Sequence, residues 1–208
     1  ANPPKVGSLR TCRDGSLLLI DHQVGTMNFG LTDVEALQLK NQTLWLAESA
    51  AAFRLPVILT TSNPDGANGP LFPELLAALP TAPVIDRLKI NAWQDPAFVE
   101  AVRITGRTKL VMAGVTADVC LTFPALGAVS DGYDVYAVMD ASGTLNHHAL
   151  SAAMLRMSQA GVKIANANMV IAEILSDWGG EFAAPLADLY ARRVPNFGFI
   201  THQLAARD

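Results

Sequence analysis

Cysteine and charged side chains are both scarce in this sequence. The chain has two cysteines among 208 residues, Cys12 and Cys120, and only 16% of its residues are charged. A domain of this length buries enough apolar surface to fold without disulfides, so we expect both cysteines to be reduced thiols. Half of the residues are hydrophobic, which is typical of a packed globular protein and excludes a disordered chain. We expect one domain over residues 1–208.

Long hydrophobic runs and basic clusters are also missing. No stretch reaches the roughly 18 consecutive apolar residues of a membrane-spanning helix, and the first residues lack the apolar core of an export signal. The net charge is -4 without a run of lysine or arginine, so the electrostatic footprint of a nucleic-acid-binding protein is absent. We expect a soluble, cytoplasmic protein whose partner is a small-molecule substrate rather than nucleic acid or a membrane.

The residue patterns that hold common cofactors do not occur either. None of the four histidines has a cysteine or another histidine at metal-ligand spacing. The sequence also lacks a Gly-x-x-x-x-Gly-Lys phosphate loop and the glycine pattern of a dinucleotide loop. We therefore expect neither a metal nor another cofactor.

Six short apolar runs divide the sequence at regular intervals. They span residues 17–21, 57–61, 83–87, 110–114, 134–140 and 162–165. The runs are nearly continuous rather than alternating, which is typical of parallel strands covered by helices on both faces. Residues 121–131 and 149–159 are among the helix-length segments between them, and Gly161 follows the second as a helix stop. This order predicts a three-layer α/β/α sandwich with a six-stranded parallel sheet.

Three charged or ionisable side chains fall where predicted strands end. Asp21 follows the first run, Arg87 ends the third, and Cys120 comes six residues after Gly114, in the turn toward the next predicted helix. In open parallel sheets, ligands bind beyond the carboxyl ends of the strands where the strand order reverses. We therefore expect Asp21, Arg87 and Cys120 to share one pocket.

This combination of side chains suits nucleophilic catalysis. A thiolate attacks an acyl carbon, a carboxylate moves the thiol proton, and a guanidinium holds the charges together. At a helix N-terminus the thiol also meets unpaired N–H groups, which we expect to favour the thiolate. Plainer interpretations exist for each residue: Cys120 as a small buried hydrophobe, Asp21 as a helix cap, and Arg87 as a structural ion-pair former.

Residues 18–23, 90–93 and 114–120 resemble the isochorismatase-like cysteine hydrolase superfamily, and within it the YcaC-like group most closely. The similarity extends over about residues 17–178 and so covers a whole domain. It implies a Rossmann-like sheet of strand order 3-2-1-4-5-6, a triad of aspartate, lysine and cysteine, and multimeric assembly. It also implies hydrolysis of a small amide, imide or related C–N substrate through a covalent thioester-like intermediate.

Carried over by position, the resemblance assigns a role to each part of the site. It makes Asp21 the acid of the triad and Cys120 the nucleophile. Backbone N–H groups of Thr116 and Cys120 would form the oxyanion hole, and a non-proline cis peptide bond would join Val115 to Thr116.

The cation departs from the wider superfamily pattern, in which a lysine ends the strand. The register of residues 83–87 places Arg87 at this position, and Lys89 would take it if the strand were longer. Arginine stabilises charge but does not transfer a proton. This exchange would leave Asp21 as the only acid/base of the site.

Asn91 and Trp93 are candidate substrate-binding residues. An amide and an indole N–H beyond a strand end suit a polar-rimmed pocket, although packing of the loop explains both residues equally well. Residues 179–208 contain more apolar side chains than a tail requires, and we expect them to contribute subunit contacts in a homo-oligomer.

Two other functions stay open at this point. The chain could be a non-hydrolytic, multimeric binding or scaffold protein that retains the family's site, because fold alone does not imply function. It could also hydrolyse a vinyl ether, as isochorismatase does, without depending on the thiol in the same way.

Overall fold

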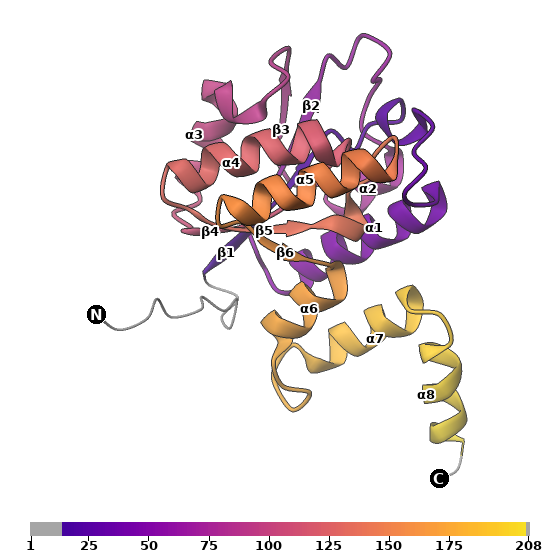
Figure 1. The fold of residues 1–208 in the computed structure, drawn as a ribbon. Coiled ribbons are helices and arrows are strands. Elements are labelled where there is room, and N and C mark those ends of the chain that lie inside the picture. The colour runs from indigo at the N-terminus through magenta and orange to yellow at the C-terminus, as the bar shows by residue number, and fades with distance from the viewer. Residues whose placement is uncertain (1–13, 207–208) are drawn as a thin grey trace.

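The structure, a computed structural model, describes residues 14–206 and contains one six-stranded parallel sheet (Figure 1). The strands are β1 Gly15–Ile20, β2 Val57–Ser62, β3 Val84–Arg87, β4 Lys109–Gly114, β5 Asp134–Val138 and β6 Lys163–Ala165. Their order in the sheet is β3-β2-β1-β4-β5-β6. Each apolar run thus forms a strand, and the predicted fold class and strand order are confirmed. Cys12 lies outside the described residues.

Helices connect the strands and form the two outer layers (Figure 1). The α-helices are α1 Ala36–Ala52, α2 Pro73–Ala78, α3 Pro96–Ile104, α4 Thr122–Ser130, α5 His147–Gln159, α6 Ala167–Leu175, α7 Ala183–Arg193 and α8 Phe197–Ala205. Shorter helical turns are η1 Thr26–Asn28, η2 Ala92–Gln94, η3 Ala117–Leu121 and η4 Met139–Ala141. The predicted helix over 121–131 is therefore preceded by a separate turn, η3, which contains Cys120.

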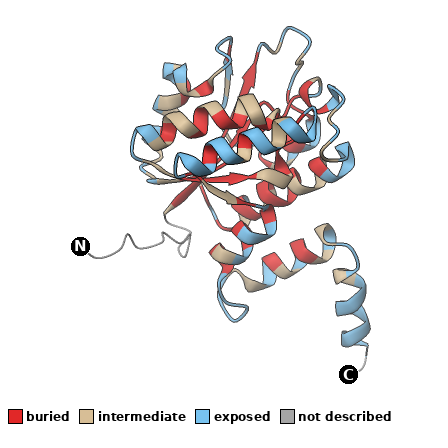
Figure 2. Cartoon of the chain, in the orientation of Figure 1, coloured by how far each residue is buried: buried red, intermediate tan, exposed pale blue. Residues whose placement is uncertain are grey.

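The sheet has a core on each face because successive side chains of a strand point in opposite directions. Leu17 and Leu19 of β1 pack with residues of α1, α2, α6 and α7, whereas Leu18 and Ile20 pack with residues of α3, α4 and α5. All four side chains are at most 1% exposed. In Figure 2 the buried strands lie between helices whose outer sides are exposed. This burial on both faces explains why the apolar runs are continuous.

Strand β3 is the exception, because it lies at the edge of the sheet. It pairs with β2 alone in the described chain, and Val84 at its start is 40% exposed. The expectation of full cover on both faces therefore fails for this strand. Its last residue, Arg87, is nevertheless only 4% exposed, so the edge strand delivers a charged side chain into the interior.

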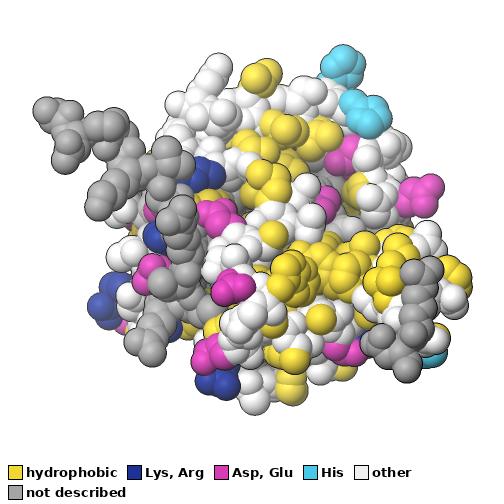
Figure 3. Space-filling view, turned by 90° about the horizontal axis from the view of Figure 1, so that it is seen from below, with side chains coloured by type: hydrophobic (Ala, Val, Ile, Leu, Met, Phe, Trp, Pro, Cys, Tyr) yellow, Lys and Arg dark blue, Asp and Glu magenta, His cyan; other side chains and the backbone are white. Residues whose placement is uncertain are grey.

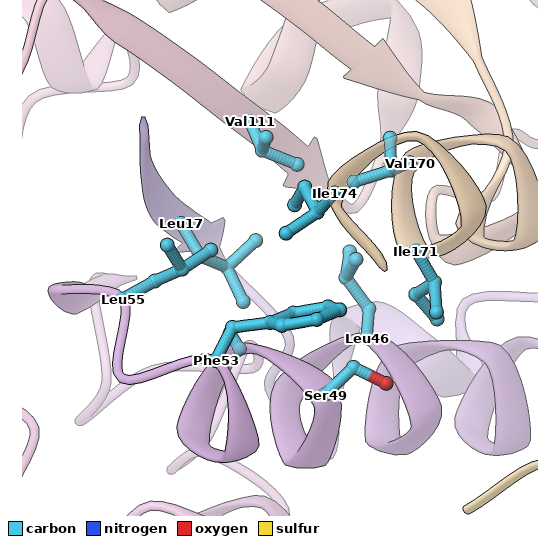
Figure 4. A pocket seen from close by; sticks show the side chains of 10 residues that line it. Leu17, Leu46, Ser49, Phe53, Leu55, Val111, Val170, Ile171 and Ile174 are labelled. Carbon is cyan, nitrogen blue, oxygen red and sulfur yellow. The ribbon is translucent and has the colours of Figure 1, made fainter. Parts of the chain in front are cut away.

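The core between α1, the sheet and α6 contains one small cavity (Figure 4). Its volume is about 10 Å³, and apolar side chains such as Phe53, Val111 and Ile174 line most of its wall, with Ser49 as the polar exception. This volume is close to the minimum for a single water molecule. The cavity is thus a packing gap and too small for a substrate.

The last two helices lie at the C-terminal end of the chain, on the side of α1 and α6 (Figure 1). Helix α7 packs on α1, where the rings of Tyr190 and Trp45 meet edge to face at 5.0 Å and Arg193 pairs with Glu48 at 2.6 Å. Helix α8 follows α7 and has no buried residue. None of the helices in residues 14–206 has the length and apolar character needed to cross a bilayer.

Two leucines of α1 test the assignment of its buried face. Leu39 is fully buried and Leu37 is 80% exposed. Truncating a buried leucine removes its transfer free energy and leaves a cavity. We expect Leu39→Ala to lower the free energy of unfolding by about 3 kcal/mol and Leu37→Ala to change it by less than about 0.5 kcal/mol, both measured by urea denaturation. Equal losses in the two variants would contradict this placement of the helix.

Candidate active site

The candidate site lies where the strand order reverses, at the carboxyl ends of β1 and β4. Asp21 follows β1 and donates its N–H to the Thr60 carbonyl at 3.0 Å, while Val115 follows β4 and donates its N–H to the Ile20 carbonyl at 3.1 Å. These bonds extend the pairing of the sheet by one residue beyond each strand. Asp21 and the start of the segment that contains Cys120 therefore lie next to each other.

Asp21 and Arg87 form a fully buried ion pair. The Arg87 Nη2 donates to both carboxylate oxygens, at 2.6 Å to Oδ1 and 2.7 Å to Oδ2, and neither side chain is exposed. The second terminal nitrogen, Nη1, donates to the carbonyls of Lys89 and Ile90. Leaving one partner of such a pair without the other costs about 3–5 kcal/mol, so the pair locks the ends of β1 and β3 together.

The same contacts decide between the two candidate cations. Lys89 is exposed, and it contributes its backbone carbonyl to Arg87 rather than its ammonium to Asp21. Strand β3 ends at Arg87, as the register of the sequence predicts. Arg87 is therefore the cation beside Asp21.

The backbone of Asp21 is left-handed, with φ at 61°. Non-glycine residues rarely adopt this conformation, which costs on the order of 1–2 kcal/mol. Strain of this kind persists where the surrounding contacts define the conformation, and it is concentrated at functional sites. Here the ion pair with Arg87 and a hydrogen bond from the Thr26 hydroxyl to the Asp21 carbonyl supply such contacts.

Cys120 lies in η3, a π-helical turn directly before α4, and its side chain is partly exposed. The thiol hydrogen bonds with the Asp21 carboxylate. Burial, followed by the negative charge of Asp21, raises the pKa of Cys120 well above its usual range, and Arg87 and the Thr116 backbone offset only part of this. The expectation that the start of the helix favours a thiolate is wrong for the free protein, because desolvation and Asp21 outweigh the N–H groups.

The pKa of Asp21 is also displaced from its usual value. Burial raises this pKa, and the charge of Arg87 and the hydrogen bond with Cys120 lower it in part. A carboxylate with a raised pKa is a stronger base than an exposed aspartate. Asp21 is therefore suited to accept the proton of the thiol that it contacts.

The turn from β4 to η3 brings two backbone N–H groups of interest close to the sulfur. The Val115–Thr116 peptide bond is cis, and the Thr116 backbone hydrogen bonds with the Cys120 thiol. The N–H of Cys120 donates to the Thr116 carbonyl at 2.8 Å. A Cβ on Gly114 would lie 3.0 Å from the Leu121 nitrogen, so this close return of the chain requires glycine.

His22 and Gln23 connect the segment after Asp21 to neighbouring loops by hydrogen bonds, a role that the sequence did not predict. Both are fully buried. His22 Nε2 donates to the Ala141 carbonyl at 2.8 Å, and the Gln23 amide donates to Ser62 and Gly69 carbonyls and accepts from the Ser62 N–H. The available indication in the sequence was that two polar residues directly follow the apolar run that ends at Asp21.

In the described residues, the side-chain hydrogen bonds of Asn91 and Trp93 are with each other and with Asp131 rather than with Asp21, Arg87 or Cys120. The Asn91 side chain accepts from the Trp93 backbone N–H and begins η2. The indole N–H of Trp93 donates to Asp131, just after α4, at 2.8 Å, and its ring lies against Gly127. Trp93 thus contacts the half of α4 that is remote from Cys120.

Comparison with known proteins agrees with this geometry. The isochorismatase domain model matches residues 16–169. The chain is 43% identical to the YcaC hydrolase of Escherichia coli over 185 residues, which cover 88% of each chain. The crystal structure of that protein, described as an octameric hydrolase of unknown specificity, superimposes with a TM-score of 0.94 at 41% identity and covers both chains completely. YcaC from Pseudomonas aeruginosa, solved with hexane-2,5-diol and covalent acrylamide, superimposes with a TM-score of 0.92 at 38% identity, over 99% of this chain and 100% of its own.

His22 makes the stability of the protein depend on pH. Burial lowers its pKa from 6.5 to about 4, so between these values the unfolded chain binds a proton that the folded chain excludes. The free energy of unfolding should therefore fall as the pH drops from about 6.5 to about 4, by about 3 kcal/mol from this residue. In His22→Asn, which has no side chain that titrates in this range, this component should disappear.

The measurement is the difference in urea midpoint between wild type and variant across that pH range, which cancels contributions from other groups. The matched control is His148→Asn, because His148 is exposed. A wild-type pH dependence retained in His22→Asn would show that His22 is not the responsible group.

Proposed function

The chain belongs to the isochorismatase family, and we propose that it is a cysteine hydrolase that cleaves a C–N bond of a small amide or imide. The observation that carries this proposal is the continuous chain of contacts from the Cys120 thiol to the Asp21 carboxylate and the Arg87 guanidinium. Covalent catalysis typically uses a nucleophile that is hydrogen-bonded to a base, with the base oriented by a third group.

The first step begins from the neutral thiol. The Cys120 proton passes to Asp21 as the sulfur attacks the carbonyl carbon, so an S–C bond forms and the C=O electron pair moves to oxygen. The positive charge of Arg87 stabilises the thiolate that develops in this step, because it lowers the pKa of Cys120. Arginine stays protonated throughout, so Asp21 carries every proton that is transferred.

Collapse of the tetrahedral species breaks the C–N bond. The leaving nitrogen takes the proton from Asp21 and departs as ammonia or an amine from an amide, or as an amide from an imide, which leaves a thioester on Cys120. Water then attacks the thioester and gives a proton to Asp21. The C–S bond breaks, the carboxylic acid is released, and the Asp21 proton returns to the sulfur, which restores the starting state.

Backbone groups of the η3 turn would stabilise the oxyanion. The N–H of Thr116 already faces the sulfur, and the N–H of Cys120 would be shared between the Thr116 carbonyl and the oxyanion. Loss of one such donor typically costs about 3–4 kcal/mol of transition-state stabilisation.

Variants of the two reacting groups test the mechanism. On any amide or imide that the wild type hydrolyses, Cys120→Ala should abolish turnover, and Asp21→Asn should lower kcat by about 100-fold or more because proton transfer is lost. Intact-mass spectrometry of quenched reactions should show an acyl adduct on the wild type and none on Cys120→Ala. Circular dichroism of the Asp21→Asn variant checks its fold, since that change also weakens a buried ion pair.

The alternatives have different signatures in the same assays. Turnover of a vinyl ether that Cys120→Ala retains would favour an isochorismatase-type reaction without a thiol nucleophile. No wild-type turnover across a broad panel of amides, imides and vinyl ethers would favour a non-hydrolytic binding or scaffold protein.

The apolar side chains of α8 support a homo-oligomer. Phe199, Ile200 and Leu204 are 67%, 54% and 56% exposed, and Ile200 and Leu204 share one helical face. In Figure 3 apolar side chains gather on the side of the molecule that carries the C-terminal helices. Clustered exposed apolar side chains commonly mark a protein–protein contact. The relative of this chain in Escherichia coli is octameric. We infer that residues 179–208 contact other copies of the chain.

Light scattering after size exclusion tests this inference. The wild type should have a mass several times the 22.1 kDa of one chain, and Phe199→Asp with Ile200→Asp should reduce it, because charged groups do not replace apolar contacts at the centre of an interface. Leu37→Asp, at an α1 leucine that is 80% exposed, should leave the mass unchanged. A monomeric wild type would contradict the inference that residues 179–208 contact other copies of the chain.

A further inference from the structure

An open groove of about 550 Å³ lies between the loop that follows β3 and the first turns of α4. Its lining residues are Ile90, Asn91, Gln94, Phe123, Leu126 and Arg156, together with the backbone at Gly127. This volume falls in the range of small-molecule sites. Neither the reaction proposed above nor the packing of the core uses the groove.

Both walls of the groove begin at residues of the candidate active site. On one wall, the carbonyl of Ile90 accepts a hydrogen bond from Arg87 Nη1 at 3.1 Å. On the other, Phe123 comes one helical turn after Cys120, at the start of α4. A small substrate bound at the thiol therefore has the groove within reach of its distal end.

Arg156 is the only charged side chain that lines the groove. Its guanidinium carbon lies 5.7 Å from the centre of the Phe123 ring, a stacking distance that orients the planar group. In the part of the chain that the structure describes, no carboxylate lies within ion-pair distance of it. The guanidinium thus offers an oriented, uncompensated positive charge.

Two side-chain amides near Arg156 can donate hydrogen bonds to a ligand. Asn91 Oδ1 is occupied by the Trp93 N–H, so its NH₂ group is the part of the amide left for a ligand, and the exposed Gln94 supplies a second NH₂ group. Ile90, Phe123 and Leu126 supply the apolar part of the lining. A planar oxyanion on a short apolar body matches this arrangement, because guanidinium forks bind carboxylates.

We propose that the groove binds the carboxylate of the substrate, so that the substrate is a small amide carrying a carboxylate at the end remote from the scissile bond. This inference rests on the proposed reaction for the position of the amide. The carboxylate site itself is inferred from Arg156, Phe123 and Asn91, and it predicts that acids bind more tightly than the matching amides whether or not the reaction occurs.

Labelling of Cys120 by matched electrophiles tests the proposal. The probes are N-acryloylglycine, N-acryloyl-β-alanine and N-acryloyl-γ-aminobutyrate, each compared with its uncharged primary amide, and the readout is the ratio of second-order labelling rates from intact mass. In the wild type, one chain length should give a ratio of roughly tenfold in favour of the acid, the scale of a partly exposed charge-assisted pair. Arg156→Gln should bring this ratio to about one.

The matched control is Arg54→Gln, because Arg54 stacks on Phe182 at 5.9 Å in the same manner but lines a different groove. It should keep the wild-type ratio. A wild-type ratio near one at every chain length, or a ratio that survives Arg156→Gln, would overturn the carboxylate site.

A second measurement separates this proposal from the proposed reaction. If none of the probes labels Cys120, the thiol mechanism fails, and equilibrium binding of the saturated N-propionyl acids and amides is then measured by calorimetry. A preference for the acid that Arg156→Gln removes would support the groove without the reaction. The absence of any preference would overturn it.

Discussion

The ion pair between Asp21 and Arg87 is the constraint on which the site depends. Asp21 follows β1 at the middle of the sheet, and Arg87 ends β3 at its edge, with β2 between them. Two strand spacings correspond to about 10 Å, a distance that a long side chain and a short one can span together. Because both side chains are fully buried, neither can turn to solvent without leaving the other uncompensated. The pair therefore positions the carboxylate before any substrate arrives.

Arginine in this place has chemical consequences that lysine would not have. Its planar guanidinium donates simultaneously to the Asp21 carboxylate and to the Lys89 and Ile90 carbonyls. These bonds direct the two carbonyls toward the guanidinium, and the neighbouring Leu88 and Ile90 are 82% and 65% exposed. The fixed charge stabilises anions but supplies no proton. In the proposed reaction, proton transfer therefore falls to Asp21, whose pKa burial already raises.

The reactive state of Cys120 depends on the balance of these same charges. Asp21 raises the pKa of Cys120 and Arg87 lowers it, with burial as the largest contribution. In the proposed reaction, the thiol therefore becomes nucleophilic only as its proton moves to Asp21. Such coupling confines reactivity to bound molecules whose electrophilic carbon lies next to the sulfur when the proton is transferred.

The sequence alone determined the architecture and indicated the candidate site residues. Six continuous apolar runs predicted six parallel strands, and residues directly after those runs, Asp21, Arg87 and Cys120, predicted a shared site, because strand ends in a parallel sheet meet at one edge. The tertiary structure decided what depends on distance and burial. It placed Arg87 rather than Lys89 beside Asp21, and it raised the pKa of Cys120, since desolvation is a property of the packed state. It also directed the Trp93 indole to Asp131 and set Arg156 against Phe123, because contacts between residues distant in sequence follow from the packing of helices rather than from the local pattern.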